Sequence, residues 1–319
     1  MFDYFPPIWL GAIFLVLGIA LVVWGAERFT DGSLSVARAF ALSPFYIGTV
    51  VAGFEPENLV TGLVANFGGL PQVALGTVIG AAVFMLTAGL GLALLLVPME
   101  VTIPRAGAVA MLVMLTVFAL IIFAGRNLGQ FDGGVLLFVV VGLLGWLYSR
   151  SPVFSPGSAA EAQPLAVHSH SRAVGLLLLG GAAMLCGAEL VVRGVRLLIA
   201  TAGFSETFVG ITIIAMGESL EETARMVVPA RRGHPELAWG NVVGTLVMLL
   251  GFNLGLIALV RPLNIDPLVL RLHVPYLIGV TLLVVLALLL ARKLGPRSGA
   301  ILVALYLLYF ALNLRHMWG

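Results

Sequence analysis

Apolar stretches alternate with short polar segments along the whole chain. Most of the apolar stretches contain about 20 residues, which is the length that an α-helix needs to cross a bilayer core of about 30 Å. The pattern therefore predicts an all-α membrane protein with about ten transmembrane helices. The expected spans are 8–27, 44–66, 71–97, 106–124, 132–149, 173–199, 206–229, 236–260, 274–291 and 299–314.

Composition agrees with this pattern. Of the 319 residues, 61% are hydrophobic and 10% are charged, whereas a soluble domain carries about 25% charged residues. We expect an integral, multi-pass protein of a plasma or inner membrane. The net charge of +2 is small and spread along the chain, which argues against a nucleic-acid partner. The single cysteine, Cys186, has apolar neighbours and is expected to be packed inside the protein.

The two halves of the chain match each other. The block WGAERFTDG at 24–32 is similar to CGAELVVRG at 186–194, and LPQVALGTVIG at 70–80 is similar to HPELAWGNVVG at 234–244. The second pair of blocks is offset by 164 positions. Chance similarity between apolar sequences would match scattered Leu and Val, whereas here glycines and a proline match. The pattern indicates an internal repeat.

A polar segment separates the halves. Residues 150–172 are rich in Ser, Pro and Ala and show no apolar period, which is typical of a loop. We expect a first five-helix repeat at 1–149, an inter-repeat loop at 150–172 and a second five-helix repeat at 173–319. Because five is odd, the second repeat must enter the membrane from the opposite side. Inverted repeats are common in secondary transporters, which bind their substrate near the bilayer midplane.

Carboxylates occur where a membrane helix should have none. The second span contains GFEPEN at 53–58 and the seventh contains GESLEE at 217–222. A charge at the centre of a membrane helix costs about 2.5–3.5 kcal/mol on insertion scales. The five glutamates of these motifs must therefore be protonated, paired, hydrated or bound to cations. Gly53, Pro56 and Gly217 weaken helical hydrogen bonding and can free backbone carbonyls near them.

Helical spacing predicts which of these groups meet. The positions i, i+3, i+4 and i+7 of the seventh span hold Glu218, Glu221, Glu222 and Arg225. We expect these four side chains on one face of one helix. Glu55 and Glu57 would approach that face from the second span, with Asn58 as a neutral oxygen donor. A hard cation such as calcium takes about six to eight oxygen ligands, and this set can supply them.

Three interpretations of Arg225 are open. In the first, Arg225 neutralises Glu221 as a fixed counter-charge, so that Glu218, Glu222 and Glu57 are left for an ion. In the second, its side chain reaches the inner membrane surface. In the third, Arg225 and Arg28 form a salt-bridged plug with the carboxylates, which fixes helix packing and binds no ion. One or two arginines are too few to neutralise five carboxylates, which argues against the third.

The order of the motifs resembles that of the cation/calcium exchanger superfamily. In that family a Gly-Thr-Ser-x-Pro-Glu motif in one helix is followed by Gly-Asn-x-x-Gly-Ser-Asn in the next. VGITIIAMGESLEE at 209–222, followed by GNVVGT at 240–245, resembles the second of the family's two repeats. IGTVVAGFEPEN at 47–58, followed by GTVIGA at 76–81, resembles the first.

The resemblance implies roles for single residues. Glu222 matches the ligand glutamate of the second repeat, and Ser219 matches the motif serine. In the first repeat Glu57, which follows Pro56, matches the ligand glutamate, and Glu55 is the competing choice.

The sequence departs from the family pattern at several positions. Glu218 stands in place of the motif threonine and Glu221 in place of the proline. Thr77, Asn241 and Thr245 are the polar residues that remain of the second motifs. Because clustered carboxylates in a dry site bind protons more tightly, the larger number of acids suits proton coupling.

We therefore predict a secondary active antiporter that exchanges a divalent cation, calcium first, for sodium or protons by alternating access. It is expected to need no cofactor and to be no enzyme, with inorganic cations and membrane lipid as partners; the oligomeric state is left open. The candidate cation ligands are Glu55, Glu57, Asn58, Glu218, Ser219, Glu221, Glu222 and Thr245. The alternatives are a proton-coupled exchanger of another cation, a homologue that does not transport, and an intramembrane enzyme. The last has no HExxH or DDxxD motif in its favour.

Overall fold

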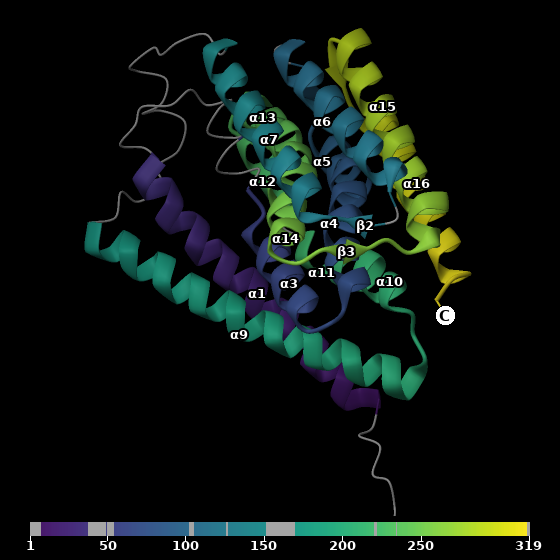
Figure 1. The fold of residues 1–319 in the computed structure, drawn as a ribbon. Coiled ribbons are helices and arrows are strands. Elements are labelled where there is room, and N and C mark those ends of the chain that lie inside the picture. Colours follow the sequence, from purple (N-terminus) through teal and green to yellow (C-terminus); the bar gives the residue numbers. More distant parts are fainter. Residues whose placement is uncertain are drawn as a thin grey trace, which may run out of the picture.

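The computed structural model describes residues 8–37, 49, 54–101, 105–125, 127–150, 170–219, 222–233 and 235–317. Eight helical stretches within these ranges are long and apolar enough to cross a membrane. The helices in chain order are α1 (Ile8–Ala37), α3 (Pro56–Phe67), α4 (Pro71–Phe84), η3 (Met85–Gly89), α5 (Leu90–Leu96), α6 (Arg105–Ala124), α7 (Gln130–Arg150), α9 (His170–Ala202), α10 (Glu206–Phe208), η4 (Val209–Ile214), α11 (Ala215–Glu218), α12 (Glu222–Arg231), α13 (Pro235–Val247), η6 (Met248–Asn253), α14 (Leu254–Val260), η7 (Val269–His273), α15 (Val274–Leu290) and α16 (Pro296–Leu314). The π-helical turns named η continue the α-helices beside them. Figure 1 shows their arrangement.

In the predicted span 44–66, the described helix α3 begins only at Pro56. Of the residues before it in this span, the structure describes Thr49, Phe54 and Glu55. Proline favours the first position of a helix because its missing N–H needs no partner there and its φ is already helical. Glu55 is the residue before this helix, so the motif lies at a helix start rather than in the middle of a helix.

The predicted span 206–229 is interrupted at its carboxylates. The run α10, η4 and α11 ends at Glu218, and α12 begins at Glu222. Between them, Ser219 has φ −93° and ψ 5°, which lies outside the α-helical range. The expectation of one continuous helix through Glu218 and Glu222 is therefore wrong, and Glu221 lies outside the described residues. With these two interrupted spans added to the eight continuous ones, the fold is an all-α membrane protein of about ten spans.

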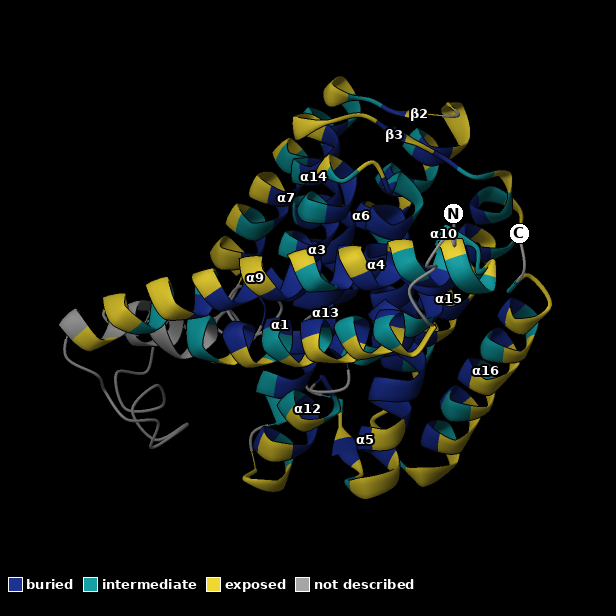
Figure 2. Cartoon of the chain, turned by 90° about the horizontal axis from the view of Figure 1, so that it is seen from below, coloured by how far each residue is buried: buried dark blue, intermediate teal, exposed yellow. Residues whose placement is uncertain are grey.

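Two equivalent spans form the centre of the bundle. These are the spans α4–η3–α5 and α13–η6–α14, each of which follows one carboxylate motif. In their most apolar stretches 89% and 83% of the residues are buried, against 28% in α1, α7, α9 and α16. The buried residues in Figure 2 accordingly gather around α4 and α13. The fold thus places both motifs beside its most enclosed helices.

Helices α1 and α9 cross each other in close backbone contact, as Figure 1 shows. Their contacting glycines recur every seven residues and pair in reverse order as Gly11 with Gly194, Gly18 with Gly187 and Gly25 with Gly180. A Cβ atom on Gly18 would lie 2.8 Å from the carbonyl oxygen of Gly187. Small residues let membrane helices approach in this way. Cys186, expected inside the protein, is exposed, because α9 turns the neighbouring Gly187 toward α1.

Two short ribbons reveal that the halves are inverted. Strand β1 (Met99–Glu100) precedes α6 and pairs antiparallel with β4 (Lys293–Leu294), which follows α15. Strand β2 (Asn127–Leu128) follows α6 and pairs with β3 (Leu263–Asn264), which precedes α15. The start of α6 is therefore tied to the end of α15, and the end of α6 to its start. These equivalent helices run in opposite directions, as an inverted repeat requires.

The ribbons predict a labelling pattern. In a Cys186→Ser background, single cysteines replacing the exposed residues Glu100 and Lys293 should react with an impermeant maleimide from one side of the membrane. Single cysteines replacing Asn127 and Asn264 should react from the other side. Reaction of both ribbons from the same side would contradict the inverted arrangement.

The same assay tests the span count between the halves. Cysteines at Arg232 and at Ala160, which lies outside the described residues, are expected to react from the side of Glu100. Spans six and seven lie between these two positions and return the chain to its starting side.

Candidate functional site

The first part of the site is the start of α3. The backbone carbonyl of Glu55 accepts a hydrogen bond from the Leu59 amide at 3.1 Å, which closes the first turn of the helix. It also accepts one from the Asn253 amide side chain at 2.8 Å. Asn253 belongs to η6 of the second half, so the other repeat holds this helix start in place. Glu55, Glu57 and Asn58 are consequently fixed inside the protein, each with 0% exposure.

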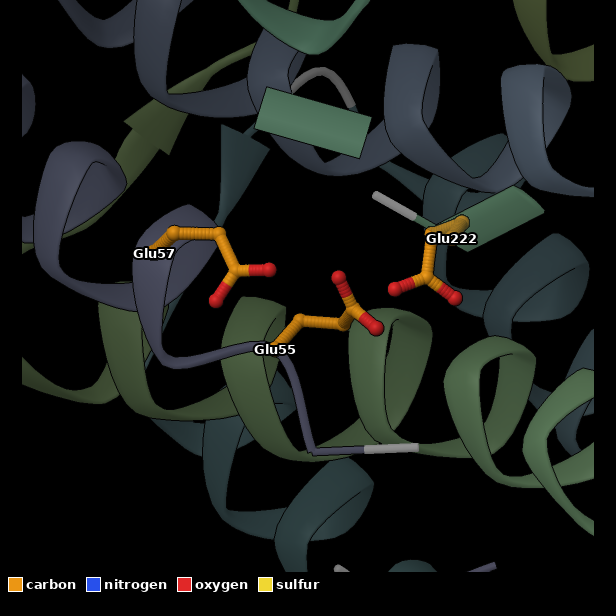
Figure 3. Close-up of side chains that lie close together, drawn as sticks. All are labelled: Glu55, Glu57 and Glu222. Atoms are coloured by element: carbon orange, nitrogen blue, oxygen red, sulfur yellow. The ribbon is translucent and has the colours of Figure 1, made fainter. Parts of the chain in front are cut away.

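Three carboxylates from the two halves meet at one point. One oxygen each of Glu55, Glu57 and Glu222 lies within 4.8 Å of the others. Figure 3 shows Glu55 between the other two, with the carboxyl groups turned toward one another. We call this group the carboxylate triad. The sequence predicts that the carboxyl groups of Glu57 and Glu222 approach within about 10 Å of each other at mid-membrane depth, as ligands of one cation would. The distance in this prediction is confirmed.

Arg225 contacts every member of the triad. Its Nη1 atom lies 2.8 Å from Oε1 of Glu222 and 3.3 Å from Oε1 of Glu55. Its Nη2 atom lies 3.6 Å from Oε1 of Glu57. The sequence led us to expect that Arg225 leaves Glu222 and Glu57 for an ion. In the structure Arg225 pairs with both of them. Its expected partner, Glu221, lies outside the described residues.

The position of Arg225 has a local cause. Because α12 begins at Glu222, Arg225 follows it by three positions on the first turn of that helix. Residues three apart lie on the same helix face, so the guanidinium of Arg225 lies on the same side of α12 as the carboxylate of Glu222. The interpretation that Arg225 reaches the membrane surface does not hold in this structure, since its side chain is only 16% exposed.

Glu218 is separate from the triad. Its Oε1 accepts a hydrogen bond from Thr61 at 2.5 Å, and its Oε2 lies 2.8 Å from the hydroxyl of Thr77. Thr61 belongs to α3 and Thr77 to α4, so Glu218 bonds to the first half. Ser219, between Glu218 and Glu222, leaves the α-helical conformation, which explains why helical spacing failed to predict this.

The other predicted ligands surround the triad. Asn58 directs its Nδ2 atom to Oε2 of Glu55 at 3.3 Å, and Thr245 donates to Oε1 of Glu55 at 3.2 Å. The hydroxyl of Ser219 is buried and has no hydrogen-bond partner among the described residues. Glu221 remains outside the described part.

Equivalent contacts relate the two halves. Thr77 lies 2.9 Å from Oδ1 of Asn58, and Asn241 donates to Oε2 of Glu222 at 2.8 Å. Asn58 and Glu222, like Thr77 and Asn241, are separated by the repeat offset of 164 positions. The contacts thus put Asn58, rather than Glu57, at the place equivalent to Glu222. The Pro-Glu dipeptide of the first motif had favoured Glu57, whereas the ungapped offset was the signal that identifies Asn58.

Several buried oxygens around the triad have no hydrogen-bond partner among the described residues. They are both carboxylate oxygens of Glu57, the Ser219 hydroxyl and the Oδ1 atoms of Asn241 and Asn253. Buried polar atoms are normally paired, because leaving them unpaired is costly. Carboxylate, hydroxyl and amide oxygens are the ligands that hard cations take. The donor set therefore fits a cation as the missing partner.

Two residues of the site were missed from the sequence. Thr61 lies one helical turn after Asn58, so helical spacing could have identified it. Asn253 lies in an apolar stretch far from both motifs, and no pattern marks it.

Comparisons with known proteins agree with this architecture. The family model described as "Sodium/calcium exchanger protein" matches residues 10–148 and 172–315. A putative antiporter, CaxA, from Alkalimonas amylolytica is 30% identical over 264 residues, which cover 80% of this chain and 82% of that protein. The uncharacterized membrane protein MJ0091 from Methanocaldococcus jannaschii is 27% identical over 309 residues, 95% of this chain and 97% of that protein.

A solved structure also matches nearly the whole chain. A structure of the sodium-calcium exchanger NCX_Mj, soaked with sodium and strontium ions, superposes with a TM-score of 0.65 and 26% sequence identity. The match covers 96% of this chain and 99% of that one.

Proposed function

Because the chain belongs to the sodium/calcium exchanger protein family, it is a membrane cation antiporter and not an enzyme, and we propose that it exchanges calcium against sodium or protons. The cation would bind the carboxylate triad. Outside the triad, Ser219 is the predicted ligand within the described ranges that adds a buried oxygen with no hydrogen-bond partner among the described residues. Asn58 and Thr245 would support the triad through Glu55, and Glu218 would act at a neighbouring position.

The convergence of the three buried carboxylates carries this proposal. Their oxygens lie within 4.8 Å of one another. Two ligands on opposite sides of one calcium ion are about 4.6–5.2 Å apart, since each bond is about 2.3–2.6 Å long. One ion can therefore bind all three groups with little movement of the carboxylates themselves. A structural polar plug would not explain why both oxygens of Glu57 accept no hydrogen bond from the described residues.

The origin of the ligands in two halves supports alternating access. Glu55 and Glu57 come from the first half and Glu222 from the second, and we propose repeat boundaries at 1–149 and 173–319 with 150–172 as the loop. Movement of one half against the other would open the site to one side of the membrane and then to the other. The ligand set would be complete only when the two halves come together around the ion.

The hydrogen bonds of Thr77 favour a proton as the counter-ion. Its hydroxyl lies between Oε2 of Glu218 at 2.8 Å and Oδ1 of Asn58 at 2.9 Å, but a hydroxyl has one hydrogen to donate. If Thr77 donates to Asn58, the contact with Glu218 needs a proton on that carboxyl. If the Asn58 amide is turned over, its oxygen faces Glu55, which then needs the proton. Each arrangement in which Thr77 bonds to both groups places one proton on a carboxyl group.

Transport into liposomes tests the function. Purified protein is reconstituted, and calcium uptake is measured with an outward sodium gradient, an outward proton gradient or neither. We expect uptake above that of protein-free liposomes with at least one gradient, and the gradient that drives it identifies the counter-ion. If neither gradient drives calcium uptake while the protein still binds another cation, calcium is the wrong substrate. If purified protein binds no cation, the non-transporting alternative is correct.

A further inference from the structure

Arg225 occupies the place where three carboxylates converge. Its two terminal nitrogens lie 2.8–3.6 Å from oxygens of Glu222, Glu55 and Glu57. These oxygens belong to the triad that a cation would need. A guanidinium carries its charge permanently, so Arg225 is itself a cation in this site.

In two of the three triad carboxylates, the oxygen that does not contact Arg225 has another polar neighbour. Oε2 of Glu222 accepts from Asn241 at 2.8 Å, and Oε2 of Glu55 faces the amide nitrogen of Asn58 at 3.3 Å. Among the described residues, Oε2 of Glu57 has no partner. An incoming cation that takes one oxygen from each carboxylate would therefore take from Glu55 and Glu222 the oxygens that Arg225 now holds.

Arg225 is placed so that it can leave. Its side chain is 16% exposed, whereas those of Glu55 and Glu57 are 0% exposed. Arg225 thus lies at the more open side of the triad. A long arginine side chain can keep its stem packed while its charged end moves toward water.

The repeat itself does not require an arginine here. The equivalent position in the first half, 164 residues earlier, is Thr61, whose hydroxyl donates to Glu218 at 2.5 Å. The same place in the architecture therefore accepts a small neutral side chain. The charge of Arg225 is an addition of the second half.

We propose that Arg225 is a tethered competitor of the transported cation: its guanidinium neutralises the empty triad and is displaced when the cation binds. The proposal rests on the cation site proposed above. It makes Arg225 the residue that sets cation affinity, because the free energy of cation binding includes the loss of these three ion pairs. A site that releases its cation easily is useful in a transporter, which must bind and release the ion in every cycle.

Calcium binding to the purified full-length protein tests the proposal. By isothermal titration calorimetry, Arg225→Gln should lower the half-saturating calcium concentration by about tenfold or more, equivalent to one lost competing charge pair. Arg225→Lys keeps the charge and should therefore bind calcium more weakly than Arg225→Gln. Arg193→Gln is the matched control, since it removes an exposed arginine that pairs with Glu189 at 2.8 Å, and it should leave calcium binding unchanged.

Chemical restoration of the charge gives a second measurement. In a Cys186→Ser background, Arg225→Cys should bind calcium as tightly as Arg225→Gln. Reaction with 2-aminoethyl methanethiosulfonate adds a tethered ammonium group and should weaken calcium binding toward the wild-type value. Reaction with propyl methanethiosulfonate adds a neutral group of similar reach and should not.

The outcomes separate this proposal from the proposed function. If the wild type exchanges calcium but Arg225→Gln binds it with unchanged affinity, or the charged and neutral adducts bind it alike, Arg225 is not a competitor and the antiporter proposal stands. If neither the wild type nor any Arg225 variant binds or exchanges a cation, both proposals fail.

Discussion

Replacing Glu222 with glutamine is expected to reduce cation exchange by at least about 100-fold, because even second-shell partners of metal sites contribute about 10–100-fold to affinity. Glutamine keeps the size of the side chain and can keep an acceptor for Asn241, which donates to Oε2 of Glu222 at 2.8 Å. It removes the negative charge that the second half contributes to the triad. Arg225 would then pair with Glu55 and Glu57 alone, and the remaining charge would hold a divalent cation poorly.

The measurement is cation uptake into liposomes, with thermal unfolding in detergent as the check on folding. We expect Glu222→Gln to unfold within a few degrees of the wild type, since no buried volume changes. Glu189→Gln is the control, because Glu189 is an exposed glutamate that also pairs with an arginine and should keep full activity. Exchange at the wild-type rate by Glu222→Gln would show that the triad is not the transport site.

Replacing Gly80 with alanine is expected to lower the free energy of unfolding by about 3 kcal/mol or more, at the upper end of overpacking effects. A Cβ atom at this position would lie 2.3 Å from the carbonyl oxygen of Ile211 and 2.6 Å from Cβ of Ala215. Backbone atoms are not free to give way, so α4 would have to separate from η4. These two elements carry Thr77 and lead into Glu218, and the hydrogen bond between those residues should be lost as well.

Thermal unfolding of the purified protein measures this effect. The matched control is Gly145→Ala on α7, where the new Cβ atom would meet nothing within 4 Å. Alanine in an open helical position stabilises a helix by about 0.5–1 kcal/mol relative to glycine, so the control should unfold at the same or a higher temperature. Equal unfolding temperatures for the two variants would refute the close contact between α4 and η4.

The sequence predicted the membrane architecture well because the rules behind it are local or statistical. The bilayer requires about 20 apolar residues for each helix, so the continuous spans could be recognised from hydrophobicity alone. The inverted repeat followed from matched glycines and an odd number of spans, and the paired strands at the two ends of α6 and α15 agree with it. The two spans that were wrong in detail are those interrupted next to carboxylates.

By itself, the sequence determined where carboxylates enter the membrane and that the two halves bring them in from opposite directions. Only the tertiary structure decided which of them meet. Ser219 leaves the α-helical conformation after Glu218, so helical spacing no longer relates Glu218 to Glu222. Glu218 lies against Thr61 and Thr77, whereas Glu222 pairs with Arg225. Contacts between side chains about 160 residues apart depend on how helices pack, and no local pattern contains that information.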